Sequence, residues 1–175
     1  FLGFVPFFNA KNTFNIYGKS DKKSPEEILK YILDYTFWPV NLEMLSAKLN
    51  IYQFPDSKLL ELGKDVSVAS IKHGHPNGAN SYRLQIGNKA IVYSTDCEHP
   101  EKDLNPNVIK LAKDADLLIH DAQYTEEELQ SHKGWGHSSW NQAIAVAKAA
   151  NVKHLALYHH DPNHDDQFLN QIESE

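Results

Sequence analysis

The sequence predicts an α/β fold. From residue 105 onward, helix patterns alternate with short apolar runs that are typical of buried strands. Earlier, two strand patterns flank Gly87-Asn88, which indicates a β-hairpin. Hydrophobic residues make up 41% of the 175 residues and charged residues 23%, as in a globular protein. Since no repeat or linker interrupts the pattern, we expect a single domain over residues 1–175.

The first half of the chain contains one expected helix and several strands. Residues 13–17 alternate in the manner of a short strand. A helix is expected to begin at Pro25, because Ser24 is a typical N-cap and Glu27 completes a capping box with it. Further strand patterns follow at residues 47–54, 59–62 and 66–71.

The second half of the chain is expected to alternate helices with buried strands. The expected strands cover residues 116–121 and 152–158. The expected helices lie at residues 106–115, at 125–130, from a cap at Ser138 or Ser139 to Ala150, and from Asp165 onward.

Polar side chains gather where apolar strands end, and His75 follows the strand at residues 66–71. In α/β folds, ligand sites form at the carboxyl ends of strands, so we expect these side chains to meet at one sheet edge. Imidazole and carboxylate groups together are the material of a hydrolytic metal site. A turn or capping role is the structural alternative for each residue alone. The residues at the three other strand ends are Asp96, His120 with Asp121, and His159 with His160.

His137 lies at the N-terminal end of an expected helix, after Gly134 and Gly136. A helix N-terminus stabilises anions, including phosphate. A histidine at that place can protonate a leaving oxygen, and Asp121 could hold its other ring nitrogen. A purely structural role of His137 in the capping loop is the alternative.

Bulk properties narrow the class of protein. The net charge of −6 argues against nucleic-acid binding by bulk electrostatics. The single cysteine, Cys97, excludes an intramolecular disulfide framework and a Cys-rich zinc module, and we expect it to be a small buried residue. No stretch approaches the roughly 18 apolar residues of a membrane span, and we expect a cytoplasmic protein.

Several segments resemble the metallo-β-lactamase superfamily, and in particular its phosphodiesterase-like branch. That branch includes phosphoribosyl cyclic phosphodiesterases and relatives of the transfer-RNA 3′-processing endonucleases. The resemblance implies an αββα sandwich and two divalent metal ions, zinc or manganese, at one edge of paired sheets. The segments are HPNGANSYRLQIGNKAIVYSTDCEH, LLIHDAQY, GWGHSSWNQAIAVAKAANVKHLALYHHDPNHDD and the early PFF, NIYG and FWPV.

The resemblance also implies roles for single residues. His75 and His159 match metal-binding histidines, with His160 as the alternative to His159, and Asp96 matches the carboxylate that bridges the metals. His137 matches the histidine that contacts phosphate or acts as general acid. The acidic residue that orients this histidine corresponds to Asp121.

The family's His-x-His-x-Asp-His signature does not occur in this sequence. We therefore expect the chain to be the C-terminal portion of such a domain, with its N-terminal part missing. The expected function of the parent protein is hydrolysis of a small-molecule phosphodiester, of the cyclic phosphate or nucleotide type, by a metal-activated water. The alternatives are a lactone or thioester hydrolase and a truncated, non-catalytic binding module that self-associates as a homo-oligomer.

Overall fold

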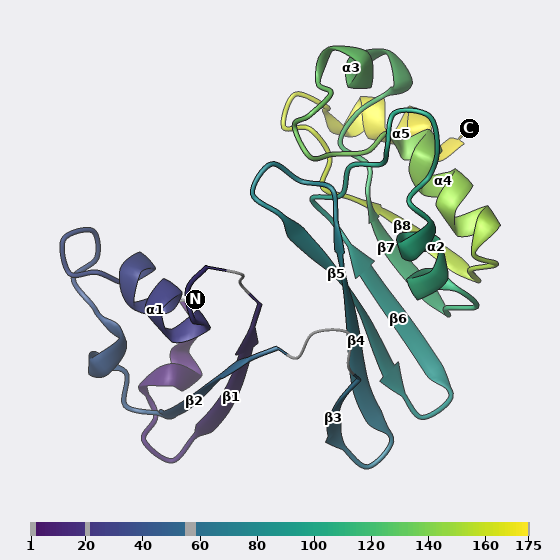
Figure 1. Ribbon diagram of the computed structural model, residues 1–175. Coiled ribbons are helices and arrows are strands. Elements are labelled where there is room, and N and C mark those ends of the chain that lie inside the picture. Colours follow the sequence, from purple (N-terminus) through teal and green to yellow (C-terminus); the bar gives the residue numbers. More distant parts are fainter. Residues whose placement is uncertain (1–2, 20–21, 55–58, 175) are drawn as a thin grey trace. The chain divides into compact units, whose positions relative to one another are not determined.

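The computed structural model describes residues 3–19, 22–54 and 59–174, which form two sheets and five α-helices (Figure 1). The predicted α/β class is thus confirmed. The chain divides into two compact units, Phe1–Asp56 and Ser57–Glu175. The single domain expected over residues 1–175, and the sandwich arrangement of its sheets, stay predictions.

The first unit is built on two parallel strands, β1 (Thr13–Gly18) and β2 (Lys48–Gln53), with helix α1 (Pro25–Ile32) between them in the sequence. The predicted capping box is present. The side chain of Ser24 accepts the N–H of Glu27 at 3.2 Å, and the Glu27 carboxylate accepts the N–H of Ser24 at 2.7 Å. Two short 3-10 helices, η1 (Val5–Phe8) and η2 (Leu42–Met44), complete the described part of this unit.

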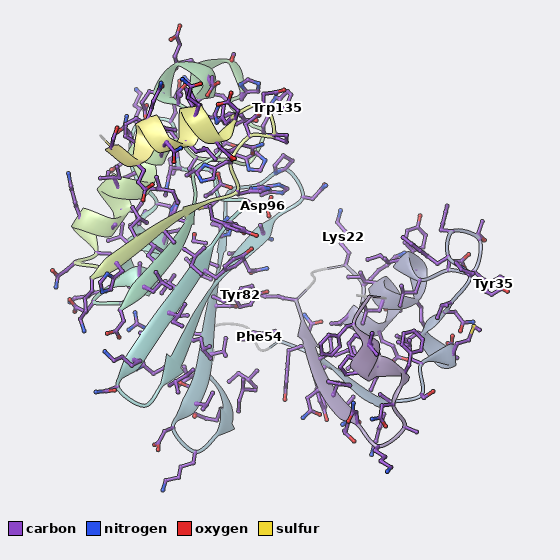
Figure 2. All side chains as sticks on the ribbon, turned by 180° about the vertical axis from the view of Figure 1, so that it is seen from behind. Lys22, Tyr35, Phe54, Tyr82, Asp96 and Trp135 are labelled. Carbon is purple, nitrogen blue, oxygen red and sulfur yellow. The ribbon has the colours of Figure 1, made fainter. Side chains whose placement is uncertain are left out.

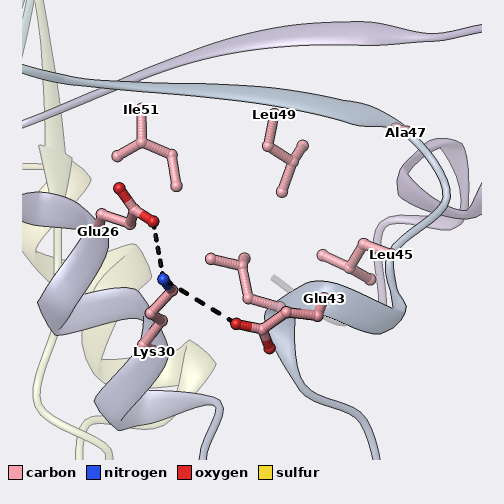
Figure 3. A pocket seen from close by; sticks show the side chains of 8 residues that line it. Glu26, Lys30, Glu43, Leu45, Ala47, Leu49 and Ile51 are labelled. Carbon is pink, nitrogen blue, oxygen red and sulfur yellow. Dashed lines mark ion pairs between the residues drawn. The ribbon is translucent and has the colours of Figure 1, made fainter.

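A pocket of about 280 Å³ lies in the first unit, with apolar side chains from β2 and the segment before it on one side (Figure 3). Lys30 lies at the pocket and pairs with Glu26 at 2.9 Å and with Glu43 at 4.0 Å. None of the predicted site residues lines this pocket. They all lie in the second unit, and so does the candidate site.

The second unit contains a six-stranded sheet in which strands neighbour one another in sequence order (Figure 1). The first four strands form antiparallel pairs, whereas β7 pairs parallel to β6 and β8 pairs parallel to β7. Because β6, β7 and β8 run in one direction, their carboxyl ends lie at the same edge of the sheet. The strands are β3 (Leu60–Gly63), β4 (Val66–His73), β5 (Ala79–Ile86), β6 (Lys89–Ser94), β7 (Leu117–Asp121) and β8 (His154–Tyr158).

Two helices cover the sheet of the second unit. Helices α2 (Pro106–Ala112) and α4 (Trp140–Ala149) pack against the strands and against each other. The core between them is fully buried and includes Val92, Leu118 and Val146. This packing positions the strands, and with them the strand ends that carry the predicted site residues. The remaining helices are α3 (Glu126–Ser131) and α5 (Asp166–Ser174).

The helices of the described residues are short. The longest, α4, has 10 residues, whereas a membrane span needs about 20. Within residues 3–19, 22–54 and 59–174, no helix is long and apolar enough to cross a bilayer.

Candidate metal centre

The strand ends place the predicted site residues at one edge of the second unit. Asp121 is the last residue of β7, Asp96 follows β6, and His159 follows β8 directly. His75 lies just beyond β4, and Figure 2 shows Asp96 at the end of the sheet near the loop of Trp135. The parallel order of β6, β7 and β8 therefore produces the convergence that the sequence predicts.

The carboxylate of Asp121 is fully buried and links these segments. Its Oδ2 accepts hydrogen bonds from the backbone N–H of Asp96 at 2.9 Å, from Nδ1 of His137 at 3.1 Å and from Nδ1 of His159 at 3.0 Å. Its Oδ1 accepts the N–H of Ser138 at 2.9 Å. Since a carboxylate only accepts, Nδ1 of both histidines carries a proton. Asp121 thus contacts the rings of both His137 and His159, and the contact to His159 was not indicated by the sequence.

These contacts shift the pKa values of Asp121 and His137. Burial alone would raise the pKa of Asp121, but the hydrogen bonds from His137, Ser138 and His159 outweigh it and lower that pKa. Burial alone would lower the pKa of His137, but its bond to the Asp121 carboxylate together with the negative charges of Asp121, Asp96 and Glu98 outweighs burial and raises that pKa. His137 therefore keeps its second proton to a higher pH than an ordinary histidine does.

Asp96 lies next to both predicted histidine ligands. Oδ1 of Asp96 lies 3.9 Å from Nε2 of His75 and 3.9 Å from Nδ1 of His159. Two ligand atoms on one zinc ion are separated by roughly 3.3 Å, so a small side-chain movement would let Asp96 and His75 share an ion. Nδ1 of His75 is buried without a hydrogen-bond partner among the described residues. Because Nδ1 of His159 donates to Asp121, its Nε2 keeps the lone pair that a metal needs.

The geometry does not gather His75, Asp96 and His159 into one compact group. Instead, ligand atoms of His75, Asp96 and His137 lie within 4.8 Å of one another, and so do those of Asp121, His137 and His159. Asp96 lies between His75 and His159, as a bridging ligand would. The donor set of imidazole and carboxylate groups fits a divalent metal ion.

Two of the candidate ligands have unusual backbone conformations. Asp96 has φ of 52° and His159 has φ of 63°, in the left-handed region that non-glycine residues seldom adopt. Such conformations persist where the surrounding structure enforces them, and they cluster at functional sites. Here the bond from the Asp96 N–H and the bond from the His159 ring to Asp121 both hold the strained residues in place.

Glu98 is a positioning residue that sequence reasoning missed. Its carboxylate accepts the N–H of Gly134 at 2.6 Å and the N–H of Gly136 at 2.9 Å, and its own N–H donates to Gly74 at 2.9 Å. Gly136 has φ of +97°, and a Cβ there would lie 2.2 Å from the ring of His75. Glu98 therefore holds the loop before His137 against the segment that carries His75. The sequence signal that could have pointed to such a residue is the pair of glycines, because the backbone N–H groups of their loop need an acceptor.

A second group of potential ligands, Cys97, His99 and His120, is buried beneath this edge. Nδ1 of His99 accepts the N–H of Asn105 at 3.0 Å, so its proton is on Nε2 and neither nitrogen is free for a metal. Nδ1 of His120 lies 2.8 Å from the carbonyl of Asp121 and donates to it. The two bonds go to the backbone, and Nε2 of His99 and Nε2 of His120 are buried without a hydrogen-bond partner among the described residues. Cys97 is buried as predicted.

Four histidines have no role that the sequence indicates, and the expectation for them is the solvent-exposed surface: His99, His132, His154 and His164. This expectation is wrong for His99. Its side chain is 6% exposed, and its ring stacks on His120 with centroids 5.4 Å apart. Burial lowers the pKa of His99 to about 3. The local sequence gave no sign of this, because the Pro100 and Glu101 that follow are typical of a surface loop.

The sequence model of the beta-lactamase superfamily domain matches residues 16–160. Ribonuclease Z of Brevibacillus brevis is 40% identical over 83 residues, which is 47% of this chain and 24% of that protein. Ribonuclease Z of Picrophilus torridus is 29% identical over 173 residues, which is 95% of this chain and 48% of that protein. The chain thus spans less than half the length of these relatives.

Solved structures share the fold at low sequence identity. Human tRNase Z, short form, matches with a TM-score of 0.66 and 18% identity, covering 87% of this chain and 62% of that one. Zn²⁺-bound PqqB from Methylobacterium extorquens matches with a TM-score of 0.64 and 14% identity, covering 99% of this chain and 64% of that one. At such identities the likeness establishes the fold.

The expected partner, a small-molecule substrate without nucleic-acid binding, is contradicted by these relatives. They are named ribonuclease Z and tRNase Z, so they are nucleic-acid enzymes. The expectation rested on the net charge of −6, and a bulk charge does not report the local field where a phosphate binds. The expected homo-oligomer stays a prediction.

We expect Glu98→Ala to loosen the loop before His137. The substitution leaves two N–H groups without their charged acceptor; because the Gly134 N–H can bind water instead, the cost in unfolding free energy is about 0.5–1.5 kcal/mol. Urea denaturation measures this cost, and the amide shifts of Gly134 and Gly136 report the loop directly. Glu101→Ala is the matched control, because Glu101 is exposed and pairs only with Lys133 among the described residues. Unchanged amide shifts in Glu98→Ala would contradict the positioning role.

We also expect acid sensitivity from His99. Its pKa is about 3 when folded and 6.5 as the ordinary value, so between these pH values the unfolded chain binds more protons. Stability is therefore complete above pH 6.5 and falls as pH drops below it, by on the order of 1 kcal/mol per pH unit. Urea denaturation from pH 7.5 to 5 measures the slope. His99→Gln should flatten it and His154→Gln, at an exposed site, should not; equal slopes in all three proteins would refute the assignment.

Proposed function

Because the chain belongs to the metallo-beta-lactamase superfamily, we propose that it supplies part of the metal centre and the general acid of a metal-dependent phosphodiesterase acting on nucleic acid. The observation that carries the proposal is the buried Asp121 carboxylate, which bonds to the rings of His137 and His159 together. One of these rings is a candidate acid and the other a candidate ligand, so a single group aligns both.

His75, Asp96 and His159 would hold the metal, with Asp96 between the two histidines. A bound divalent ion lowers the pKa of a water ligand toward about 7 and polarises phosphoryl oxygens. The donor set and the zinc-bound structural relative support zinc, with manganese as the alternative and two ions as the expected number. His159 is preferred over His160, because only His159 has a recorded bond to Asp121 or Asp96 within the described residues.

His137 would donate the proton that the leaving oxygen needs. In its charged form both ring nitrogens carry protons, and Nδ1–H is held by Asp121, so Nε2–H remains to be given away. The bond to Asp121 stabilises the charged form and contributes to the raised pKa of His137, which favours the proton-loaded form of the acid. Asp121 therefore acts through His137 and contacts no substrate itself.

A phosphodiester is favoured over a lactone or thioester by the setting of His137. The next residues, Ser138 and Ser139, lead into α4, whose N-cap is Ser139, and the N-terminal end of a helix favours an anion. The relatives named for ribonuclease activity support the same bond. A non-catalytic binding module is the second candidate, since the chain spans less than half the length of those relatives.

We expect the zinc- or manganese-loaded chain to hydrolyse an RNA phosphodiester and bis-p-nitrophenyl phosphate in preference to a homoserine lactone. Metal content by elemental mass spectrometry and initial rates on the three substrates make the measurement. A preference for the lactone would overturn the phosphodiester assignment. Bound metal without turnover of any substrate would favour the binding module.

We expect His137→Ala to keep its metal and to lose turnover selectively. The loss should be about 10²- to 10⁴-fold on an ester with a poor alkoxide leaving group. It should be smaller on bis-p-nitrophenyl phosphate, because nitrophenolate leaves without a proton. His154→Ala, at an exposed position, is the control. Equal turnover of the alkoxide ester by His137→Ala and the parent chain would remove His137 from the mechanism.

A further inference from the structure

We propose that Trp135 is a stacking platform for a nucleobase of the substrate, next to the scissile phosphate. The proposal rests on the proposed function, since it deepens the same site. The Trp135 side chain is 59% exposed, although it follows Gly134 and precedes Gly136 in the loop that leads into His137. A large aromatic surface left in water beside a candidate acid is available to a ligand.

The backbone on both sides of Trp135 is fixed. Gly134 has φ of +84° and Gly136 has φ of +97°, and both conformations are open to glycine and strained for other residues. The carboxylate of Glu98 accepts the N–H of each glycine, at 2.6 and 2.9 Å. The loop is thus tied down on either side of the indole, so a ligand that stacks there need not first order it.

One side of the indole is supported by an aromatic row. The rings of Trp135 and His132 meet edge to face with centroids 4.8 Å apart, and His132 stacks on Tyr124 at 4.5 Å and 18°. Tyr124 is 2% exposed and meets the ring of His137 at 6.0 Å. The row therefore runs from His137 through the buried Tyr124 and His132 to the exposed indole, and it restrains the orientation of the indole.

The distance from Trp135 to the reacting group suits a nucleotide. Consecutive Cα atoms are 3.8 Å apart, so the Cα of Trp135 lies within about 7.6 Å of that of His137. The loop therefore carries the indole and the candidate acid only two residues apart. In the proposed complex, the base of the scissile nucleotide or of its neighbour stacks on the indole while the phosphate lies at His137.

Stacking also fits the chemistry of the surface. Every nucleobase presents a π face, so a stacking platform accepts RNA with little sequence preference. It needs no excess of positive charge, which is consistent with a chain of net charge −6. The ligand class is therefore single-stranded RNA, held by one base against Trp135.

The test is equilibrium binding of a fluorescein-labelled RNA tetranucleotide and of an abasic ribose-phosphate tetramer of equal charge, measured by anisotropy on the zinc-loaded chain. We expect the parent chain to bind the RNA more tightly than the abasic tetramer. Trp135→Ala should weaken RNA binding about 5- to 100-fold and remove the preference, while Trp135→Phe should retain most of it. Trp38→Ala, which changes an exposed tryptophan of the first unit, should match the parent chain.

The outcomes separate the two proposals. Equal affinity of the parent chain for the RNA and the abasic tetramer would overturn the stacking role and leave phosphodiester recognition standing. Binding of neither ligand would overturn both. If Trp135→Ala lost affinity equally for both ligands, Trp135 would support the loop and the stacking role would be overturned. A changed oligomeric state of this variant would also overturn it, because Trp135 would then contact a second copy of the chain. The amide shifts of Gly134 and Gly136 check that each variant keeps the loop.

Discussion

The carboxylate of Asp121 is the group on which the arrangement of the site depends. It is fully buried at the end of β7, where an ionised carboxylate without partners would cost several kcal/mol. Donors from the segments after β6, after β8 and before α4 offset that cost. Each donor is also a position at which the chain is held, so satisfying one charge aligns three segments that are distant in the sequence.

Glu98 does the same for the loop on the other side of His137. Its carboxylate binds backbone N–H groups, whereas Asp121 binds both backbone and imidazole. Without such support the loop could move and displace the ring of His137. Small misplacements of a reacting group are costly in rate. The two acids therefore hold His137 from its ring and from its backbone. Neither needs to contact the substrate to matter for turnover.

Local signals made much of the fold predictable. The capping box of Ser24 and Glu27, the cap at Ser139 and the Gly87-Asn88 turn each involve neighbours in the sequence, and the elements that they predict are present. The meeting of Asp96 with Asp121 was predictable because parallel strands end at one edge.

Contacts between distant residues were not predictable in this way. The bonds of Glu98 to Gly134 and Gly136 join residues 36 and 38 positions apart, and no periodic pattern records them. The burial of His99 depends on the ring of His120, which lies on β7, 21 positions further along the chain. The nucleic-acid relatives could not be inferred from a net charge, because a net charge does not say where the charged residues lie.

The left-handed backbone of Asp96 and His159 affects how such a chain can evolve. Glycine would relieve the strained backbone at both positions. Selection for stability alone would therefore favour replacing the two side chains that converge on the site. Retaining them against that drift would require selection for chemistry.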